Sequence, residues 1–402
     1  MKYFDYKVLK AVLFFLIITS GRSAFCQKDS INIWKPYLLS NHPLGIFTSR
    51  INHNFNSHAS SKYQVSFTLS RGNVWLPEVV SNHLTKKADQ DFYSKILWHE
   101  RESTFKLNPA ESKQEILMAD GIFSSYYLQL NGPLSKKADF NFSIKANQIS
   151  GGKVPFSLLT SDQLLEWFHT NIAGGEDPFG RKLYDFNQNK FFYQDKNGGI
   201  INIEDDRLLL TEVSFDAYFY PVFSYFEKHN IKINTGIHTG GSIINNKVNF
   251  DLGLMSTLSK KIYSKKRLTI HTGFAGSALT PNIIKSSKVS INQNKVLFSL
   301  ESQWNFVRKI KPTRDFIFGI NYHLQSAFQP TSELDNIVLT GKRNVSHWHY
   351  AGRSLHLGSQ GWSFIFSIRN KAFTYSTFFR EDFVVDNAPD FQVGWGIAYK
   401  LN

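Results

Sequence analysis

The chain ends with the stretch Phe391-Gln-Val-Gly-Trp-Gly-Ile-Ala-Tyr-Lys-Leu-Asn402, in which large apolar or aromatic residues alternate with small or polar ones. Because successive side chains of a strand point to opposite faces, one face of this segment is apolar and the other is small and polar. Aromatics at both ends of the apolar face are typical of the strand that closes a transmembrane β-barrel, where they sit at the two membrane interfaces. The last strand of a soluble β-sandwich has a similar pattern.

The same alternation recurs along most of the chain. It is most regular in residues 63–69 and 296–306, and a strand of such a length crosses a bilayer when it is tilted. A closed single-chain barrel has an even number of strands, so we expect about twelve, within a range of ten to fourteen. The other candidate strands are residues 44–55, 122–130, 140–146, 209–219, 231–237, 248–254, 268–274, 316–324, 362–368 and 373–379.

The connections between these candidates alternate in length, which is a second and independent signal. Gly, Asn, Pro and charged residues favour tight reversals at 131–133, 226–230, 259–266, 308–313 and 370–371. Long excursions cover 72–113, 151–206, 278–293 and 328–358. Short periplasmic turns and long extracellular loops are usual in outer-membrane barrels. The sequence therefore predicts an all-β fold, a transmembrane antiparallel up-and-down β-barrel.

The excursion at 151–206 contains structural signals of its own. Thr160-Ser-Asp-Gln-Leu-Leu-Glu-Trp-Phe-His169 starts with capping residues and spaces its apolar residues as in a helix, so one short loop helix is expected. Phe191-Phe-Tyr193 followed by Asn197-Gly-Gly199 predicts a hairpin. A helix and a hairpin of this size could lie over the barrel mouth or fold into it.

The N-terminus predicts the compartment. Residues 1–26 have a lysine-containing start, the apolar run Ala11-Val-Leu-Phe-Phe-Leu-Ile-Ile18 and a small-residue end, which together match a secretory signal peptide cleaved before Gln27. Cys26 is the single cysteine, and the residues before it do not form a lipobox. A mature chain without cysteine forms no disulfide. We expect residues 27–402 to form a single barrel domain.

Composition agrees with a barrel. Aromatic residues make up 15% of the chain, and the mean hydropathy of −0.27 is compatible with strands that are apolar on only one face. The net charge of +14 is spread over many turn-like stretches. Because a nucleic-acid interface needs a continuous basic stripe, we predict contacts with solvent and anionic lipid head groups, and no nucleic-acid partner.

The middle third of the chain resembles a known family. The stretches that carry the resemblance are Tyr127-Leu-Gln-Leu130-Asn-Gly-Pro-Leu134, Val154-Pro-Phe156, and a loop motif made of Phe168, His169, Gly174, Gly175, Asp177 and Arg181. They resemble the outer-membrane proteins grouped as domain of unknown function 3187. The resemblance implies an outer-membrane β-barrel and supplies no reaction. Asn402, where barrels usually end in an aromatic, departs from the signal for the barrel assembly machinery.

Polar side chains on the strand faces opposite the apolar rows are predicted to point into the lumen. Both signs of charge occur among them, so they either pair to fill a narrow interior or line a water-filled path and set its selectivity. The carboxylates are the foremost candidates, because an unpaired charge inside a barrel is costly. The lumen-facing candidates are Glu212, Asp216, Asp251, His271, Glu301, Gln303, Arg369 and Arg380.

A hydrolase site for lipid chains would need a Ser or Thr close to a His that an Asn, Asp or Glu orients. Ser346, His347 and His271 offer these residue types, but their spacing matches neither a Gly-x-Ser-x-Gly elbow nor a His-Glu-x-x-His motif. His347 and His349 are too few to predict a metal site. We therefore predict no cofactor and no metal, and we rank an enzyme below a passive role.

The expected function is that of a porin-like protein in the outer membrane of a Gram-negative envelope. It would act as a pore for small solutes or as a structural envelope protein, with outer-membrane lipid and, through its C-terminal strand, the barrel assembly machinery as partners. The alternatives are an outer-membrane lipid-modifying hydrolase and a secreted carbohydrate-binding β-sandwich. The sequence predicts neither the solute nor the oligomeric state.

Overall fold

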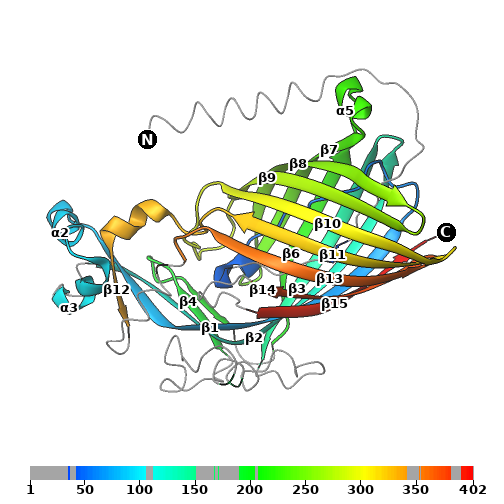
Figure 1. The fold of residues 1–402 in the computed structure, drawn as a ribbon. Coiled ribbons are helices and arrows are strands. Elements are labelled where there is room, and N and C mark those ends of the chain that lie inside the picture. The colour runs from blue at the N-terminus through cyan, green and yellow to red at the C-terminus, as the bar shows by residue number, and fades with distance from the viewer. Residues whose placement is uncertain are drawn as a thin grey trace.

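The structure is a computed structural model that describes residues 35–36, 42–105, 112–150, 167, 171, 190–203, 207–341, 353, 355–381 and 391–401. Its main feature is a closed antiparallel β-barrel (Figure 1). The barrel strands are β1 (Gln64–Leu84), β2 (Ser112–Ser135), β3 (Ala138–Ser150), β6 (Leu209–Phe219), β7 (Ile231–Ile244), β8 (Lys247–Lys265), β9 (Leu268–Ile284), β10 (Leu297–Lys311), β11 (Arg314–Gln325), β13 (Ser359–Asn370), β14 (Phe373–Glu381) and β15 (Phe391–Lys400).

The barrel closes at its first strand. β1 pairs with β2 from Gln64 to Leu84 and also with β15, where Val65 lies opposite Tyr399 and Leu69 opposite Trp395. All other barrel strands pair with their neighbours in chain order. The predicted up-and-down barrel of about twelve strands, closed by the C-terminal strand, is therefore confirmed. A closed barrel is not two packed sheets, so the β-sandwich alternative is wrong.

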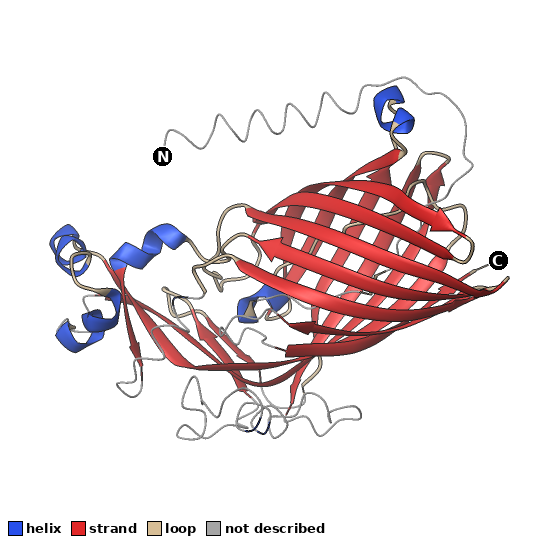
Figure 2. Cartoon of the chain, viewed as in Figure 1, coloured by secondary structure: helices blue, strands red, loops and turns tan. Residues whose placement is uncertain are grey.

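The two ends of the barrel differ. At the short-turn end, tight reversals join β2 to β3, β8 to β9, β10 to β11 and β13 to β14, and helix α5 (Ser224–Lys228) joins β6 to β7. At the opposite loop end lie α2 (Lys87–Tyr93), η2 (Trp98–Glu100), α3 (Arg101–Thr104) and η6 (Thr331–Asn336), and Figure 2 shows these helices beyond the strands. The exception at the loop end is the tight β7–β8 turn, where Asn245 and Asn246 have positive φ.

The two faces of the barrel wall have opposite polarity. In the β10–β11 ladder the pairs Glu301–His323 and Gln303–Asn321 face inward and are buried, whereas Trp304–Ile320 faces outward. Large apolar side chains of the outer face are strongly exposed, for example Phe274 at 52% and Leu300 at 58%. A polar interior inside an apolar outer belt is the distribution expected of a barrel that contacts lipid.

Among the described residues, none of the helices has the length and apolar character needed to cross a membrane.

β1 and β2 are longer than the barrel and continue past its loop end as a ribbon (Figure 1). On one edge of this ribbon β12 (Ile337–Gly341) pairs with β1, and on the other the hairpin of β4 (Lys190–Gln194) and β5 (Ile200–Ile203) pairs with β2. The predicted hairpin is thus confirmed, with Gly198 at a φ of 82° in its turn. It lies at the barrel mouth rather than inside the barrel.

Several expectations are wrong. The predicted turns at 259–266 and 308–313 lie mostly within β8 and β10, and the predicted excursions 72–113 and 278–293 begin within β1 and β9. The loop helix expected at 160–169 lies outside the described residues, apart from Trp167.

Two further expectations also fail. Residues 44–55 are not a strand: they form η1 (Pro43–Phe47) and an extended segment inside the barrel. Residues 131–133 are not a turn but part of β2, where Gly132 lies opposite Phe140 and a bulge follows Pro133. A proline at a bulge is tolerated in a strand because the ladder is already interrupted there. The reversal itself occurs at Lys136 and Lys137.

Candidate functional site

The lumen is occupied by the chain's own N-terminal segment, which we call the plug (residues 42–62). The plug starts with η1 at the loop end of the barrel (Figure 1, blue). The Leu44 N–H donates to Nδ1 of His42 at 3.0 Å, and Pro43 has the φ that suits the first helical position. After η1 the plug has no strand pairing and runs toward the start of β1 at the short-turn end.

The loop-end part of the plug is apolar. Leu44, Ile46 and Phe47 are buried in the main hydrophobic cluster, together with residues of β1, β2 and the β4–β5 hairpin. The rings of Phe47 and Phe191 lie 5.6 Å apart, centre to centre. Burying each of these side chains contributes about 1.5–3 kcal/mol, which holds η1 at the mouth.

The middle of the plug docks on charged strand residues. The Ser49 N–H donates to Oδ2 of Asp251 at 2.9 Å, and the Ser49 hydroxyl lies 2.9 Å from Nε2 of His238. Nδ1 of His238 lies 2.6 Å from Oδ1 of Asp216. With the Nδ1 proton donated to Asp216, Nε2 accepts the proton of Ser49. Three strands thereby hold one plug residue.

Two further carboxylates contact the same segment. Glu212 forms a 2.6 Å ion pair with Lys145 and accepts the Arg50 N–H at 3.3 Å. Glu301 lies 2.6 Å from Nδ1 of His53 and also pairs with Lys35. A buried carboxylate is stable only when paired and hydrogen-bonded, so these contacts tie the plug to the wall.

The short-turn half of the plug is held mainly by hydrogen bonds to its backbone. The Tyr218 hydroxyl donates to the carbonyl of Asn52 at 2.7 Å. The side-chain amide of Asn234 donates to the carbonyls of Asn54 and Asn56 at 2.6 and 3.1 Å. Because the plug has no ladder partner, these groups satisfy backbone acceptors that would otherwise be buried alone.

Glycines on the inner wall leave space for plug side chains. A Cβ built on Gly253 would lie 2.5 Å from Cδ1 of Ile51, and one built on Gly273 would lie 2.3 Å from Cδ1 of Phe55. Both distances are shorter than any normal carbon–carbon contact. The wall is therefore shaped around the plug.

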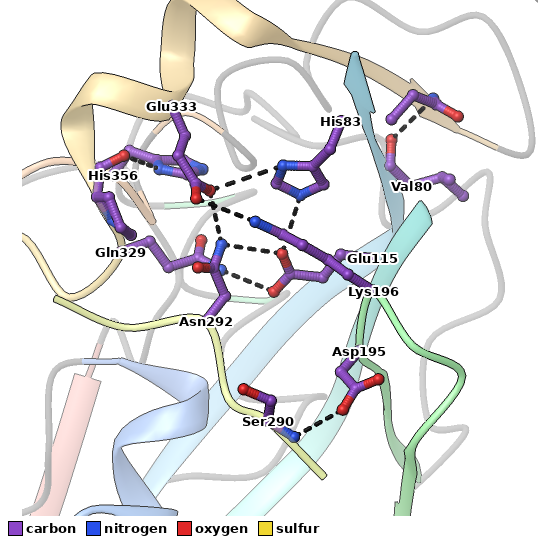
Figure 3. Close-up of polar contacts among 12 residues, drawn as sticks. Val80, His83, Glu115, Asp195, Lys196, Ser290, Asn292, Gln329, Glu333 and His356 are labelled. Atoms are coloured by element: carbon purple, nitrogen blue, oxygen red, sulfur yellow. Dashed lines mark hydrogen bonds and ion pairs between the residues drawn. The ribbon is translucent and has the colours of Figure 1, made fainter. Parts of the chain in front are cut away.

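A second polar cluster, the loop-end network, joins the segments above the plug (Figure 3). Glu115 accepts hydrogen bonds from His83 at 3.1 Å, Gln329 at 3.0 Å and Asn292 at 3.0 Å. Asn292 also donates to Glu333, which pairs with Lys196 at 3.0 Å. Burial alone would raise the pKa of Glu333, but the hydrogen bonds from Asn292 and Lys196 and the charge of Lys196 lower it. The network consists of His83, Glu115, Tyr193, Lys196, Asn292, Gln329 and Glu333.

The structure places the predicted lumen residues as follows. Glu212, Asp216, Asp251 and Glu301 lie together around the plug, as described above. Gln303 donates to Asn305 and accepts from Asn321 on the same inner wall. His271 lies opposite Lys261 toward the short-turn end, apart from the four carboxylates. Arg380 is buried beside Gly361, and Arg369 lies opposite Asp315. The remaining predicted site residues fall outside the described residues; they are Ser346, His347, Phe168, His169, Gly174, Gly175, Asp177 and Arg181.

The plug is the element of this site that the sequence interpretation missed. Its residues 51–56 alternate apolar and polar side chains and so resemble a strand. Every second residue of this stretch, however, is an asparagine: Asn52, Asn54 and Asn56. Asparagine is depleted in strands. That asparagine repeat was the available signal for irregular backbone.

The plug contacts the inner wall from η1 at the loop end to residue 56 toward the short-turn end. Among the described residues, no group of three or more His, Cys, Asp or Glu is placed to hold a metal ion. The contacts observed at the site are those of an extended segment hydrogen-bonded to charged wall residues.

No family model matches the chain, and no curated protein matches it. Among solved structures, it is similar to an outer membrane channel from Pseudomonas putida F1, with 8% identity, a TM-score of 0.37, and coverage of 86% of this chain and 98% of that one. It is also similar to the KdgM porin in complex with disordered oligogalacturonate (7% identity, TM-score 0.32, 81% and 99% covered) and to the translocator domain of the autotransporter NalP from Neisseria meningitidis (5%, 0.30, 86% and 90%). All three TM-scores lie below 0.5, so none of these likenesses specifies a function.

Proposed function

We propose that the protein is an outer-membrane channel for small solutes whose lumen is closed by its own N-terminal plug. The observation that carries the proposal is a lipid-type outer face around a polar lumen, combined with a plug that is held by side-chain contacts rather than by a β-ladder. A segment outside the ladder can leave the lumen while every strand pair of the wall stays intact. The short-turn end would face the periplasm and the loop end the exterior. Membership of domain of unknown function 3187 stays a prediction.

The channel proposal predicts that conductance depends on the plug. Purified full-length protein in planar bilayers should show little current, because the plug fills the lumen. A variant lacking residues 42–60 keeps Tyr63 and the whole of β1, and it should conduct strongly. A second variant, Asp216→Asn combined with Glu301→Gln, should raise the open fraction without removing any chain.

Folding of each variant is checked by its heat-modifiable electrophoretic mobility, which reports a closed barrel. A folded deletion variant that stays silent would overturn the channel proposal and leave a structural envelope role. A wild-type protein as conductive as the deletion variant would show that the plug does not close the path.

A specific observation favours a second candidate, a hydrolase. Ser49, His238 and Asp216 have the nucleophile–base–carboxylate order of a serine hydrolase, at 2.9 and 2.6 Å. Acyl transfer also needs backbone N–H groups for the developing oxyanion. Here the N–H of Ser49 donates to Asp251 and that of Arg50 to Glu212. Two nearby carboxylates would destabilise an oxyanion, so these residues fit an anchor better than a catalytic site.

Covalent labelling separates the two candidates. An anchoring Ser49 should not react with a fluorophosphonate probe in the folded protein. Labelling of the wild type that disappears in Ser49→Ala, together with fatty-acid release from phospholipid, would reverse the ranking.

A further inference from the structure

Basic residues lie on the lumen face of several strands at the short-turn end. Arg369 follows the buried inward residues Ile365 and Ser367 on β13, and Lys400 follows buried Ala398 on β15. On β7, Lys232 precedes the buried inward residue Asn234. Since side chains alternate across a strand, all three basic residues are directed to the lumen rather than to lipid.

A cavity of about 200 Å³ opens at this end between the plug and residues of β1, β2, β3, β6 and β15. Of the three basic residues above, Lys400 lines it. Lys62 and Lys400 line it, together with the amide side chains of Asn54, Asn56 and Gln129. Lys62 is exposed and Lys400 is half-buried, so the cavity opens to solvent at the short-turn end. It is large enough for several waters or a small solute.

The positive charge of the cavity lining exceeds its negative charge, because the described lining contains Lys62 and Lys400 but one carboxylate, that of Asp139, outside the Lys35 ion pair. Among the described residues, no ion pair involves Lys62 or Lys400, and both belong to the cavity lining. The carboxylate of Asp139, which also lines the cavity, is engaged by the Ser60 N–H at 2.9 Å and by the Tyr220 hydroxyl. Lys35 pairs with Glu301.

The titration of a neighbouring plug histidine agrees with this charge. The pKa of His58 is lowered, first by burial and then by the positive charges of Lys400 and Lys232. His58 also lines the cavity. The charges of Lys400 and Lys232 therefore disfavour a further cation at His58.

We propose that this cavity binds a small organic anion, with a carboxylate or phosphate group between Lys62 and Lys400 and with its hydroxyl groups hydrogen-bonded by the amides of Asn54, Asn56 and Gln129. Lysine ammonium groups are suited to such anions as point charges. The inward basic residues of the same end would concentrate anions at the mouth and set the selectivity of the path. The inference names the solute class of the proposed channel and in that respect rests on it.

Binding is tested on the folded full-length protein in detergent by calorimetry with gluconate, inorganic phosphate and neutral glucose as probes. Gluconate or phosphate should bind and glucose should not. The double variant Lys62→Gln/Lys400→Gln should bind the anion roughly tenfold more weakly or worse, which corresponds to about 1.4 kcal/mol. The matched control Lys136→Gln/Lys265→Gln removes the same charge from two exposed residues of the same end, one in the β2–β3 turn and one at the end of β8, and should bind like the wild type.

Preference for gluconate over phosphate would identify a carboxylated, hydroxylated ligand, and the reverse preference a phosphorylated one. Equal binding by the two double variants, or no anion binding by the wild type, would overturn the inference.

Selectivity is tested separately, in the deletion variant that lacks residues 42–60 and retains Lys62. In a KCl gradient its reversal potential should indicate anion preference, and the Lys62→Gln/Lys400→Gln substitutions should shift it toward cations. Current without anion preference would overturn the inference of an anion site and leave the channel proposal standing. Absence of current would overturn the channel proposal, while the calorimetry would still decide whether the cavity binds anions.

Discussion

At the scale of single residues, the lumen is built from charges that have partners on the plug. Glu301 is the clearest case, because it joins β10 to Lys35 and His53 of the N-terminal segment. A carboxylate placed there by a strand pattern alone would be an uncompensated buried charge. Lys35 and His53 lie more than 240 positions away from Glu301 in sequence.

We predict that Glu301→Gln loosens the plug. Removing one member of a buried ion pair typically costs about 3–5 kcal/mol, since the remaining charges stay buried. The measurement is the rate of maleimide labelling of Ile51→Cys in a Cys26→Ser background, which should rise. Glu227→Gln is the control, because Glu227 is partly exposed and lies 3.7 Å from Lys232. An equal rise in both variants would contradict the anchoring role of Glu301.

We also predict that acid favours release through His42. Burial, and then the charge of His356, lower the pKa of docked His42 to about 3. In a released plug, His42 would have the ordinary histidine pKa of about 6.5. As the pH falls below that value, the released form binds a proton at His42 and the docked form does not. Docking should therefore weaken by about 1.4 kcal/mol per pH unit between the two pKa values and keep its full strength above pH ~6.5.

Conductance recorded at pH ~7 and ~5 measures this effect. His42→Asn keeps a side-chain acceptor for the Leu44 N–H but cannot titrate. It should therefore show a smaller increase in current on acidification than the wild type. Identical increases would assign the acid response to other groups.

At the scale of elements, the strands and the plug fit by shape as well as by charge. We predict that Gly273→Ala displaces the plug, because the added Cβ would lie 2.3 Å from Phe55, a buried ring. Labelling of Ile51→Cys and channel current should both increase. Gly276→Ala on the same strand is the matched control, since its Cβ meets Leu300 on the outer face at 3.3 Å and the Ser299 carbonyl at 3.9 Å, and no plug residue. A silent, unlabelled Gly273→Ala variant would mean that the wall, not the plug, adapts.

The loop-end network predicts a separate effect on the external segments. Glu115→Gln removes the charged acceptor shared by His83, Asn292 and Gln329, and each hydrogen bond to a charged group contributes about 1.5–3 kcal/mol. Limited proteolysis of intact cells or proteoliposomes should cut the loops faster. Lys87→Gln breaks only an exposed pair with Asp91 and should leave the rate unchanged. Unchanged cutting of Glu115→Gln would argue that β12 and the hairpin hold the loops by themselves.

Individual strands were predictable because each has an apolar outer face and a polar lumen face, which produces a period-two pattern in the sequence. Every candidate except residues 44–55 became a barrel strand, although β1, β2 and β8 extend well beyond the predicted cores. The added length of β1 and β2 includes the ribbon beyond the loop end, whereas residues 255–259 of β8 continue the inward–outward alternation within the wall. The plug was not predictable in the same way, because its docking depends on Asp216, Asp251 and Glu301, contacts that no local pattern encodes.

At the scale of the whole molecule, the apolar outer belt requires a lipid environment. We predict that the protein fractionates with the outer membrane, resists carbonate extraction and migrates differently in gels before and after boiling. These expectations follow from the hydrogen-bonded closure of the barrel between β1 and β15. Unfolding such a barrel exposes unpaired strand edges together with the apolar outer face, so it requires harsh conditions. Extraction by carbonate with no change in mobility would contradict a membrane-embedded barrel.

The chain order of plug and wall has a consequence for biogenesis. The segment that ends inside the barrel is translated before β1, and the seam between β1 and β15 requires the last strand to be made. The N-terminal segment is therefore available as a template while the sheet is still open, and the wall can curl around it instead of being threaded afterwards. Loss of the segment should then slow maturation in the cell even where the finished barrel tolerates its absence.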